Sequence, residues 1–152
     1  MKHLSVILLS LILFCDAGCK KSNTDNATDT YNNTSTETTP VRTALLSGQW
    51  KVTYFLNSGS NQTANFGEYK FTLNSNGLLT GANTLFSQNG NWTLNSDSGK
   101  TKLNIDFTSA PLFTELTGDW EITSRTSTKI VMQHVSGGSG QTNYLTTDKE
   151  AV

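Results

Sequence analysis

The sequence predicts an all-β domain, an antiparallel eight-stranded up-and-down barrel, in the C-terminal part of a 152-residue chain. Three observations carry this prediction. Beyond residue 44, short runs of alternating apolar and polar residues recur at roughly 8–12-residue spacing. Asn, Gly, Ser and Asp, which favour turns, separate these runs. No long helical pattern interrupts them, and closing eight successive strands into a barrel removes the exposed edges of a sheet.

The N-terminus has the composition of a signal peptide. A short basic start precedes an almost wholly apolar run over residues 4–14, and two small residues stand directly before Cys19. The run is shorter than the roughly 20 residues that a membrane-spanning helix needs. Cleavage before Cys19 would remove Cys15 and leave a single cysteine at the new N-terminus. We therefore expect residues 1–18 to be a lipoprotein signal and Cys19 to carry a lipid that attaches the protein to a membrane.

A polar segment follows the expected lipidation site. Residues 19–43 are rich in Thr and Asn, and Tyr31 and Val41 are the exceptions to the polar character of the segment. Such a composition buries too little apolar surface to offset the entropy of ordering, so it predicts a disordered tether. As a flexible coil, this length of chain would reach roughly 25–30 Å. The domain itself is predicted to occupy residues 44–152.

Eight strands are expected in order along this domain. They run through residues 50–56, 68–73, 78–82, 92–94, 103–107, 120–122, 130–134 and 144–147. Turns are predicted at four sites that are rich in Asn, Asp and Gly, because these residues tolerate positive φ. The sites are Asn74–Gly77, Asn89-Gly90, Asp97–Gly99 and Gly137–Gly140. Residues 111–116 lack alternation, so we expect one helical turn there, with Leu112 and Phe113 closing one end of the barrel.

Seven aromatic residues fall on positions that the alternation places inside the barrel. They are Trp50, Tyr54, Tyr69, Phe71, Trp92, Phe107 and Trp120. These side chains either line a cavity for an apolar ligand or fill the interior as a packed core. An eight-stranded barrel is just wide enough for its side chains to fill or for one small ligand. Aromatic side chains occupy much of that space, which favours the packed core.

The sequence offers little support for catalysis or for metal, cofactor or nucleic-acid binding. Between residues 51 and 150, seven basic and eight acidic residues are scattered, without a basic stripe for nucleic acid. His134 is the only histidine after the signal, so zinc ligands and a catalytic triad are not expected. Asp119 and Glu121 are expected to be solvated on the polar side of a strand. We predict a protein that is not an enzyme and needs no cofactor.

Several short motifs together resemble a known family. The motifs are Gly48-Gln49-Trp50 at the first strand, then residues 50–55, 67–73, 75–77, 90–92, 119–122 and 135–138. In order and spacing they are similar to the lipocalin-like domain family of Gram-negative bacterial lipoproteins, over about residues 45–149. A basic residue late in the chain covers the first-strand Trp in many lipocalins, and Arg125 and Lys149 are the candidates here.

The resemblance implies a non-enzymatic, lipid-anchored protein of the bacterial cell envelope, at the outer membrane. It would bind either a small hydrophobic ligand or another envelope component. The alternative is a structural, interaction or inhibitor module whose barrel is a rigid scaffold with no internal ligand. The size of the interior cavity distinguishes the two, since ligand pockets measure roughly 300 Å³ or more.

Overall fold

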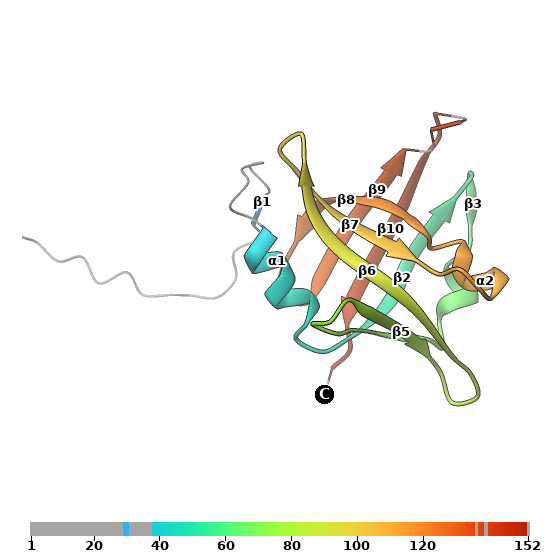
Figure 1. The fold of residues 1–152 in the computed structure, drawn as a ribbon. Coiled ribbons are helices and arrows are strands. Elements are labelled where there is room, and N and C mark those ends of the chain that lie inside the picture. The colour runs from blue at the N-terminus through green and yellow to red at the C-terminus, as the bar shows by residue number, and fades with distance from the viewer. Residues whose placement is uncertain (1–28, 31–37, 136, 139, 152) are drawn as a thin grey trace, which may run out of the picture.

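A computed structural model describes residues 29–30, 38–135, 137–138 and 140–151 of the chain. Its elements, labelled in Figure 1, follow one another in this order: β1 (Asp29–Thr30), α1 (Thr38–Leu45), β2 (Gln49–Asn57), β3 (Ser60–Asn61), the 3-10 helix η1 (Thr63–Phe66), β4 (Lys70–Leu73), β5 (Leu78–Ala82), β6 (Ser87–Asp97), β7 (Lys100–Asp106), α2 (Pro111–Thr114), β8 (Gly118–Arg125), β9 (Lys129–Val135) and β10 (Thr142–Lys149).

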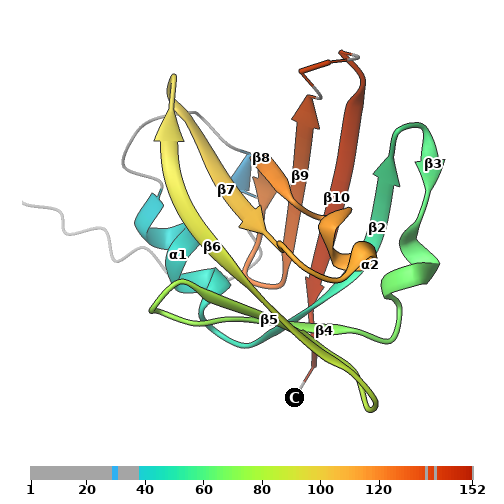
Figure 2. The ribbon, with the colours of Figure 1, turned by 45° about the vertical axis from the view of Figure 1, so that its right-hand side comes forward.

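Eight of the described strands close into an antiparallel barrel. From β4 to β10 each strand pairs with the next one along the chain, β2 pairs with β4, and β10 pairs with β2 to complete the ring. Figure 2 shows β9 and β10 standing upright at the back while β4 and β5 cross below them. The short strands β1 and β3 add to β8 and β2 from outside the ring. The predicted fold class, an eight-stranded up-and-down barrel, is therefore confirmed.

Described structure is present before the predicted domain start at residue 44. Helix α1 covers residues predicted as tether, and its Val41 and Leu45 are 0% and 2% exposed. These two residues are four apart and therefore share one face of a helix, which packs on the end of the barrel. β1 also lies within residues 19–43 and pairs with Ser124 and Arg125 of β8. The predicted signal peptide, Cys19 and residues 31–37 lie outside the described residues.

Strand β2 does not keep the simple alternation that the sequence suggested. Its pairing with β10 shifts by one residue, because Tyr54 opposes Thr146 while Val52 opposes Thr147. The extra residue is Thr53, and a β-bulge of this kind reverses which side chains face inward. Phe55 is therefore fully buried, whereas Tyr54 is 39% exposed on the outer surface. Placing Tyr54 inside the barrel was wrong for this reason.

The predicted turn at Asn89-Gly90 is a second correction, since both residues lie within the long strand β6. The turn between β5 and β6 lies instead at residues 83–86. Gly90 is required for packing, because a Cβ there would lie 2.5 Å from the carbonyl oxygen of Asp106 and 2.6 Å from the ring of Phe107. The predicted turns at Asn74–Gly77 and Asp97–Gly99 form as expected, with positive φ at Gly77, Ser98 and Gly99. The segment around Gly137 and Gly138 also joins β9 to its partner β10.

Candidate functional site

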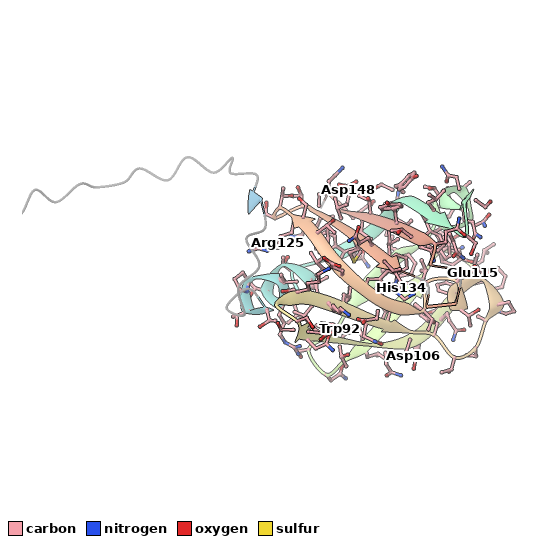
Figure 3. All side chains as sticks on the ribbon, turned by 90° about the horizontal axis from the view of Figure 1, so that it is seen from above. Trp92, Asp106, Glu115, Arg125, His134 and Asp148 are labelled. Carbon is pink, nitrogen blue, oxygen red and sulfur yellow. The ribbon has the colours of Figure 1, made fainter. Side chains whose placement is uncertain are left out.

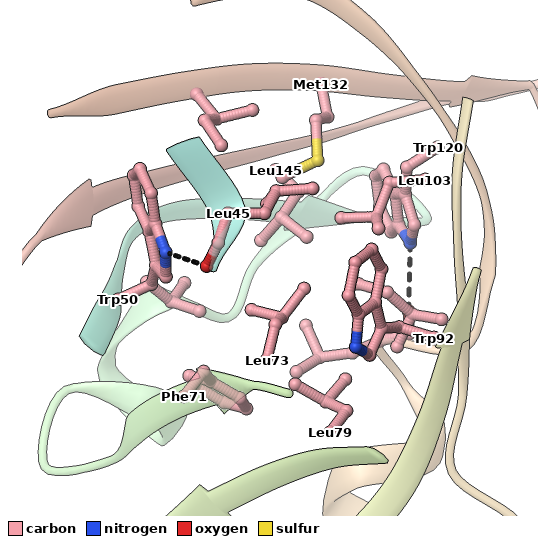
Figure 4. Close-up of a cluster of buried hydrophobic side chains, with 14 of the residues drawn as sticks. Leu45, Trp50, Phe71, Leu73, Leu79, Trp92, Leu103, Trp120, Met132 and Leu145 are labelled. Atoms are coloured by element: carbon pink, nitrogen blue, oxygen red, sulfur yellow. Dashed lines mark hydrogen bonds between the residues drawn. The ribbon is translucent and has the colours of Figure 1, made fainter. Parts of the chain in front are cut away.

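The barrel interior, the site that the aromatic residues predicted, is occupied by side chains. Trp50, Phe71, Trp92, Phe107 and Trp120 are between 1% and 6% exposed and belong to one core cluster. Figure 4 shows four of these five among the leucines of the core. The two tyrosines differ, since Tyr54 faces outward and Tyr69 lies half-buried before β4 against Phe113. Five of the seven predicted interior residues are therefore in the core.

Three further phenylalanines that were not predicted as interior β positions complete the aromatic core. The bulge in β2 turns the side chain of Phe55 into the core, and η1 places Phe66 there. Phe113 of α2 contacts the rings of Phe66, Phe71 and Phe107 at centroid distances of 5.1 to 6.2 Å. Its position agrees with the expectation that Leu112 and Phe113 close one barrel end. No local alternation marks these residues, because two of them lie in short helices.

Little free volume remains between these side chains. The interior cavity measures about 40 Å³ and is lined by apolar side chains, including Leu79, Ile105 and Met132. Pockets for drug-sized ligands measure roughly 300–1,000 Å³. The interior as it stands has no room for such a molecule.

A helix closes each end of the barrel, and a tryptophan donates a hydrogen bond to a carbonyl in or just after that helix. Trp50 donates its indole N–H to the carbonyl of Leu45 in α1 at 3.0 Å, and Trp120 donates to Leu116 after α2 at 2.9 Å (Figure 4). A buried indole N–H needs such a partner. Helix α1 therefore closes the barrel beside Trp50. Lys149, one of the two candidates, lies opposite Trp50 in the β10–β2 pairing and donates to Ser47.

Outside the α2 end lies a polar recess, which we call the mouth recess. It has a volume of about 290 Å³ and is lined by Asn57, Thr114, Glu115, Thr117, Trp120, His134 and Asn143. The amide of Asn57 donates a short hydrogen bond to the Glu115 carboxylate, and Asn143 accepts one from the backbone N–H of Ser58 at 2.9 Å. Figure 3 shows His134 and Glu115 toward the same end of the molecule.

A backbone carbonyl, rather than the side chain of a catalytic residue, orients the ring of His134. Its Nδ1 lies 2.9 Å from the carbonyl oxygen of Asp119, so Nδ1 carries the proton, because a carbonyl only accepts. The ring packs on Trp120 with centroids 5.7 Å apart. This arrangement leaves Nε2 for a ligand. The sequence did not indicate the mouth recess because its residues come from β2, β8, β9, β10 and the α2 region.

The carboxylates of Asp119 and Glu121 each form an ion pair with a lysine of β7. Asp119 pairs with Lys102 at 2.9 Å, and Glu121 pairs with Lys100 at 2.8 Å. Lys102 also bonds Asp97 at 2.9 Å, which joins β6, β7 and β8 on the outer surface. Because both carboxylates hydrogen-bond its ammonium group, the pKa of Lys102 is raised. The hydrogen bond from Lys102, followed by that from Ser98, lowers the pKa of Asp97.

Replacing Lys102 should raise the pKa of Asp97 back toward its ordinary value of 3.8. A carboxylate with a lowered pKa stabilises the fold above its unfolded pKa, and this contribution is lost as pH falls through the folded value. Carbon-detected NMR titration of Lys102→Ala measures the shift. Lys100→Ala is the matched control, because Lys100 affects Asp97 least of the named partners. Equal shifts in both variants would contradict the assignment to Lys102.

The molecule also carries exposed apolar side chains in two places. Tyr54, Val135 and Tyr144 lie on the outer face of β2, β9 and β10. Leu85 and Phe86 form the end of the β5–β6 hairpin and are 80% and 66% exposed.

The described residues contain neither a metal-binding cluster nor a membrane-spanning helix. Within them, no three His, Cys, Asp or Glu side chains are grouped closely enough to hold a metal ion. The same part of the chain contains no helix with the length and apolar character to cross a bilayer.

Comparison with known proteins finds structural likeness but no family. No family model matches the chain, and no curated protein does. A solved structure of a DUF4847 family protein from Bacteroides vulgatus is similar with a TM-score of 0.49 and 18% sequence identity, over 73% of this chain and 99% of that one. A likeness at this level supports no conclusion about function. Membership of the lipocalin-like lipoprotein family stays a prediction.

Proposed function

We propose that this protein is a lipid-anchored, non-enzymatic barrel of the bacterial cell envelope that acts through its outer surface, as a rigid interaction module without an internal ligand. The observation that carries the proposal is the interior cavity of about 40 Å³. An apolar ligand inside the barrel would have to displace core side chains such as Leu79 and Met132, which are 2% and 1% exposed. Displacing side chains from a close-packed core costs too much for a carrier site.

The surface offers features suited to a partner. The mouth recess presents a carboxylate, an imidazole and amide groups that are held in place by Ser58, Asn57 and Asp119. Polar groups that are fixed before binding lose less entropy when a partner arrives. We therefore place the contact with another envelope component at this end of the barrel. Anchoring through Cys19 and residence at the outer membrane remain part of the proposal and rest on the signal sequence.

Native mass spectrometry of the protein purified from its own host tests the proposal. The expected mass is that of the chain from Cys19 onward plus acyl chains, with no additional apolar small molecule retained. A stoichiometric hydrophobic ligand released on denaturation would contradict the scaffold function and favour a carrier. A mass without acyl chains would contradict anchoring while leaving the scaffold function intact.

A further inference from the structure

The mouth recess carries a negative charge that its own lining does not balance. Glu115 is the only carboxylate among the residues that line it, and none of these residues is Lys or Arg. The Oε2 atom of Glu115 accepts the hydrogen bond from Asn57, whereas no described residue hydrogen-bonds or pairs with Oε1. The carboxylate of Asp119 adds no net charge to the neighbourhood, because it forms an ion pair with Lys102. The recess therefore presents one uncompensated carboxylate oxygen.

Most hydrogen-bond donors in the lining are already used within the protein. The hydroxyls of Thr114 and Thr117 donate to backbone carbonyls at 2.8 and 3.3 Å. The indole of Trp120 and the Nδ1–H of His134 each do the same at 2.9 Å. These groups can offer a ligand only their remaining lone pairs, above all Nε2 of the neutral imidazole and the hydroxyl oxygen of Thr114. The amide N–H groups of Asn143 remain as donors, because only its oxygen is engaged.

A primary ammonium group matches this set of acceptors. It carries a positive charge and three N–H donors but no acceptor. Glu115 would supply a charge-assisted hydrogen bond and Nε2 of His134 a neutral one. Arginine fits less well, since its planar guanidinium is bound best by both oxygens of a carboxylate, and Asn57 already occupies one of them. The acceptors therefore favour lysine over arginine.

We infer that the mouth recess binds a lysine side chain of a partner protein, with the ammonium group held between Glu115 and His134. The inference rests on the proposed interaction function and names the chemistry of its contact. Both residues lie toward the same end of the molecule (Figure 3). Asn57 is a positioning residue, because its hydrogen bond holds the Glu115 carboxylate in place before the lysine arrives. The amide of Asn143 is available to a carbonyl oxygen beside that lysine.

NMR of the imidazole nitrogens measures this contact directly. His134 is the only histidine after the predicted signal, so the mature chain gives a single set of ring signals. The probe is Nα-acetyl-lysine amide, added to the full mature chain at about pH 8, where an ordinary imidazole is neutral. We expect a saturable shift of the Nε2 signal with a dissociation constant in the millimolar range. The same compound acetylated on Nε, and the corresponding arginine derivative, should bind about tenfold more weakly or worse.

Two matched variants test the charge of the recess. Glu115→Gln should weaken binding of the lysine derivative by about tenfold or more, because the charge-assisted hydrogen bond is lost. The new amide oxygen can still accept the hydrogen bond from Asn57, which preserves the shape of the site. Glu68→Gln makes the same change of charge at an exposed residue in a different surface groove, and it should change the affinity by less than about twofold. Amide fingerprint spectra check that both variants are folded.

The outcomes separate this inference from the proposed function. An Nε2 signal that does not respond to the lysine derivative, or equal losses of affinity in the two variants, would overturn the lysine site. Tighter binding of glucosamine than of the lysine derivative would also overturn it and assign the recess to an amino sugar. Neither result would affect the scaffold function, which depends on the absence of an internal ligand in native mass spectrometry. A hydrophobic ligand found there would contradict the scaffold, whereas the titration would still report on the recess.

Discussion

Trp50→Ala should lower the free energy of unfolding by about 3–5 kcal/mol, a large part of the 5–15 kcal/mol that a domain possesses. The side chain is 1% exposed and borders the small interior cavity, so its removal leaves a void that the close-packed core cannot fill. The substitution also removes the hydrogen-bond donor to the buried carbonyl of Leu45. Loss of this hydrogen bond should also weaken the packing of α1 on the end of the barrel. Urea unfolding followed by circular dichroism measures the change.

Tyr54→Ala on the same strand is the control for this prediction. Because the bulge at Thr53 turns Tyr54 outward, its loss should change stability by less than about 1 kcal/mol. The pair of variants therefore tests the register of β2 as well as the core. Similar losses from both variants would mean that β2 continues its alternation without a bulge. A near-neutral Trp50→Ala would contradict the placement of the first strand.

Cys19→Ser should abolish attachment to the membrane and leave the protein in the soluble periplasmic fraction. The Cys19 side chain is the only thiol that remains once residues 1–18 have been removed. Acyl chains contribute about 0.8 kcal/mol for each buried CH₂, so their loss reduces membrane affinity by many orders of magnitude. Fractionation of cells followed by immunoblotting measures the distribution. The expected result is a nearly complete transfer from the membrane pellet to the supernatant.

Cys15→Ser provides the matched control, since Cys15 lies within the segment expected to be removed. It should leave both the acyl mass and the membrane fraction unchanged. If Cys19→Ser stayed quantitatively in the pellet after carbonate washing, lipid attachment at Cys19 would be wrong. The combined loss of attachment in both variants would instead indicate a defect in export.

Much of the architecture follows from local patterns in the sequence. Phe71, Leu73 and Leu103 alternate with polar residues, and each is buried on a strand in the structure. The turns at Gly77 and Gly99 were predicted because positive φ favours glycine. Such features depend on near neighbours in the chain, so periodicity and composition are sufficient to predict them.

The errors come from features with long-range causes. A bulge in β2 depends on its pairing with β10, more than 90 residues away, as in the hydrogen bond from Thr53 to Asp148. The glycine of Asn89-Gly90 resembles a turn signal, yet it is needed because Asp106 and Phe107 pack against it. Helix α1 offers only two large aliphatic residues, Val41 and Leu45, and these become buried because they pack on the end of the barrel. None of these partners is visible in a local window of sequence.

The sequence by itself determined the class of this protein, because the period-two alternation and the spacing of its turns allow few other ways of burying apolar side chains. Only the tertiary structure decided that the interior is full, since it buries Phe55, Phe66 and Phe113 as well and leaves a cavity of only about 40 Å³. Strand patterns report which side of a sheet is apolar. The space left between side chains depends on contacts among residues far apart in the chain, and these form only when the barrel closes.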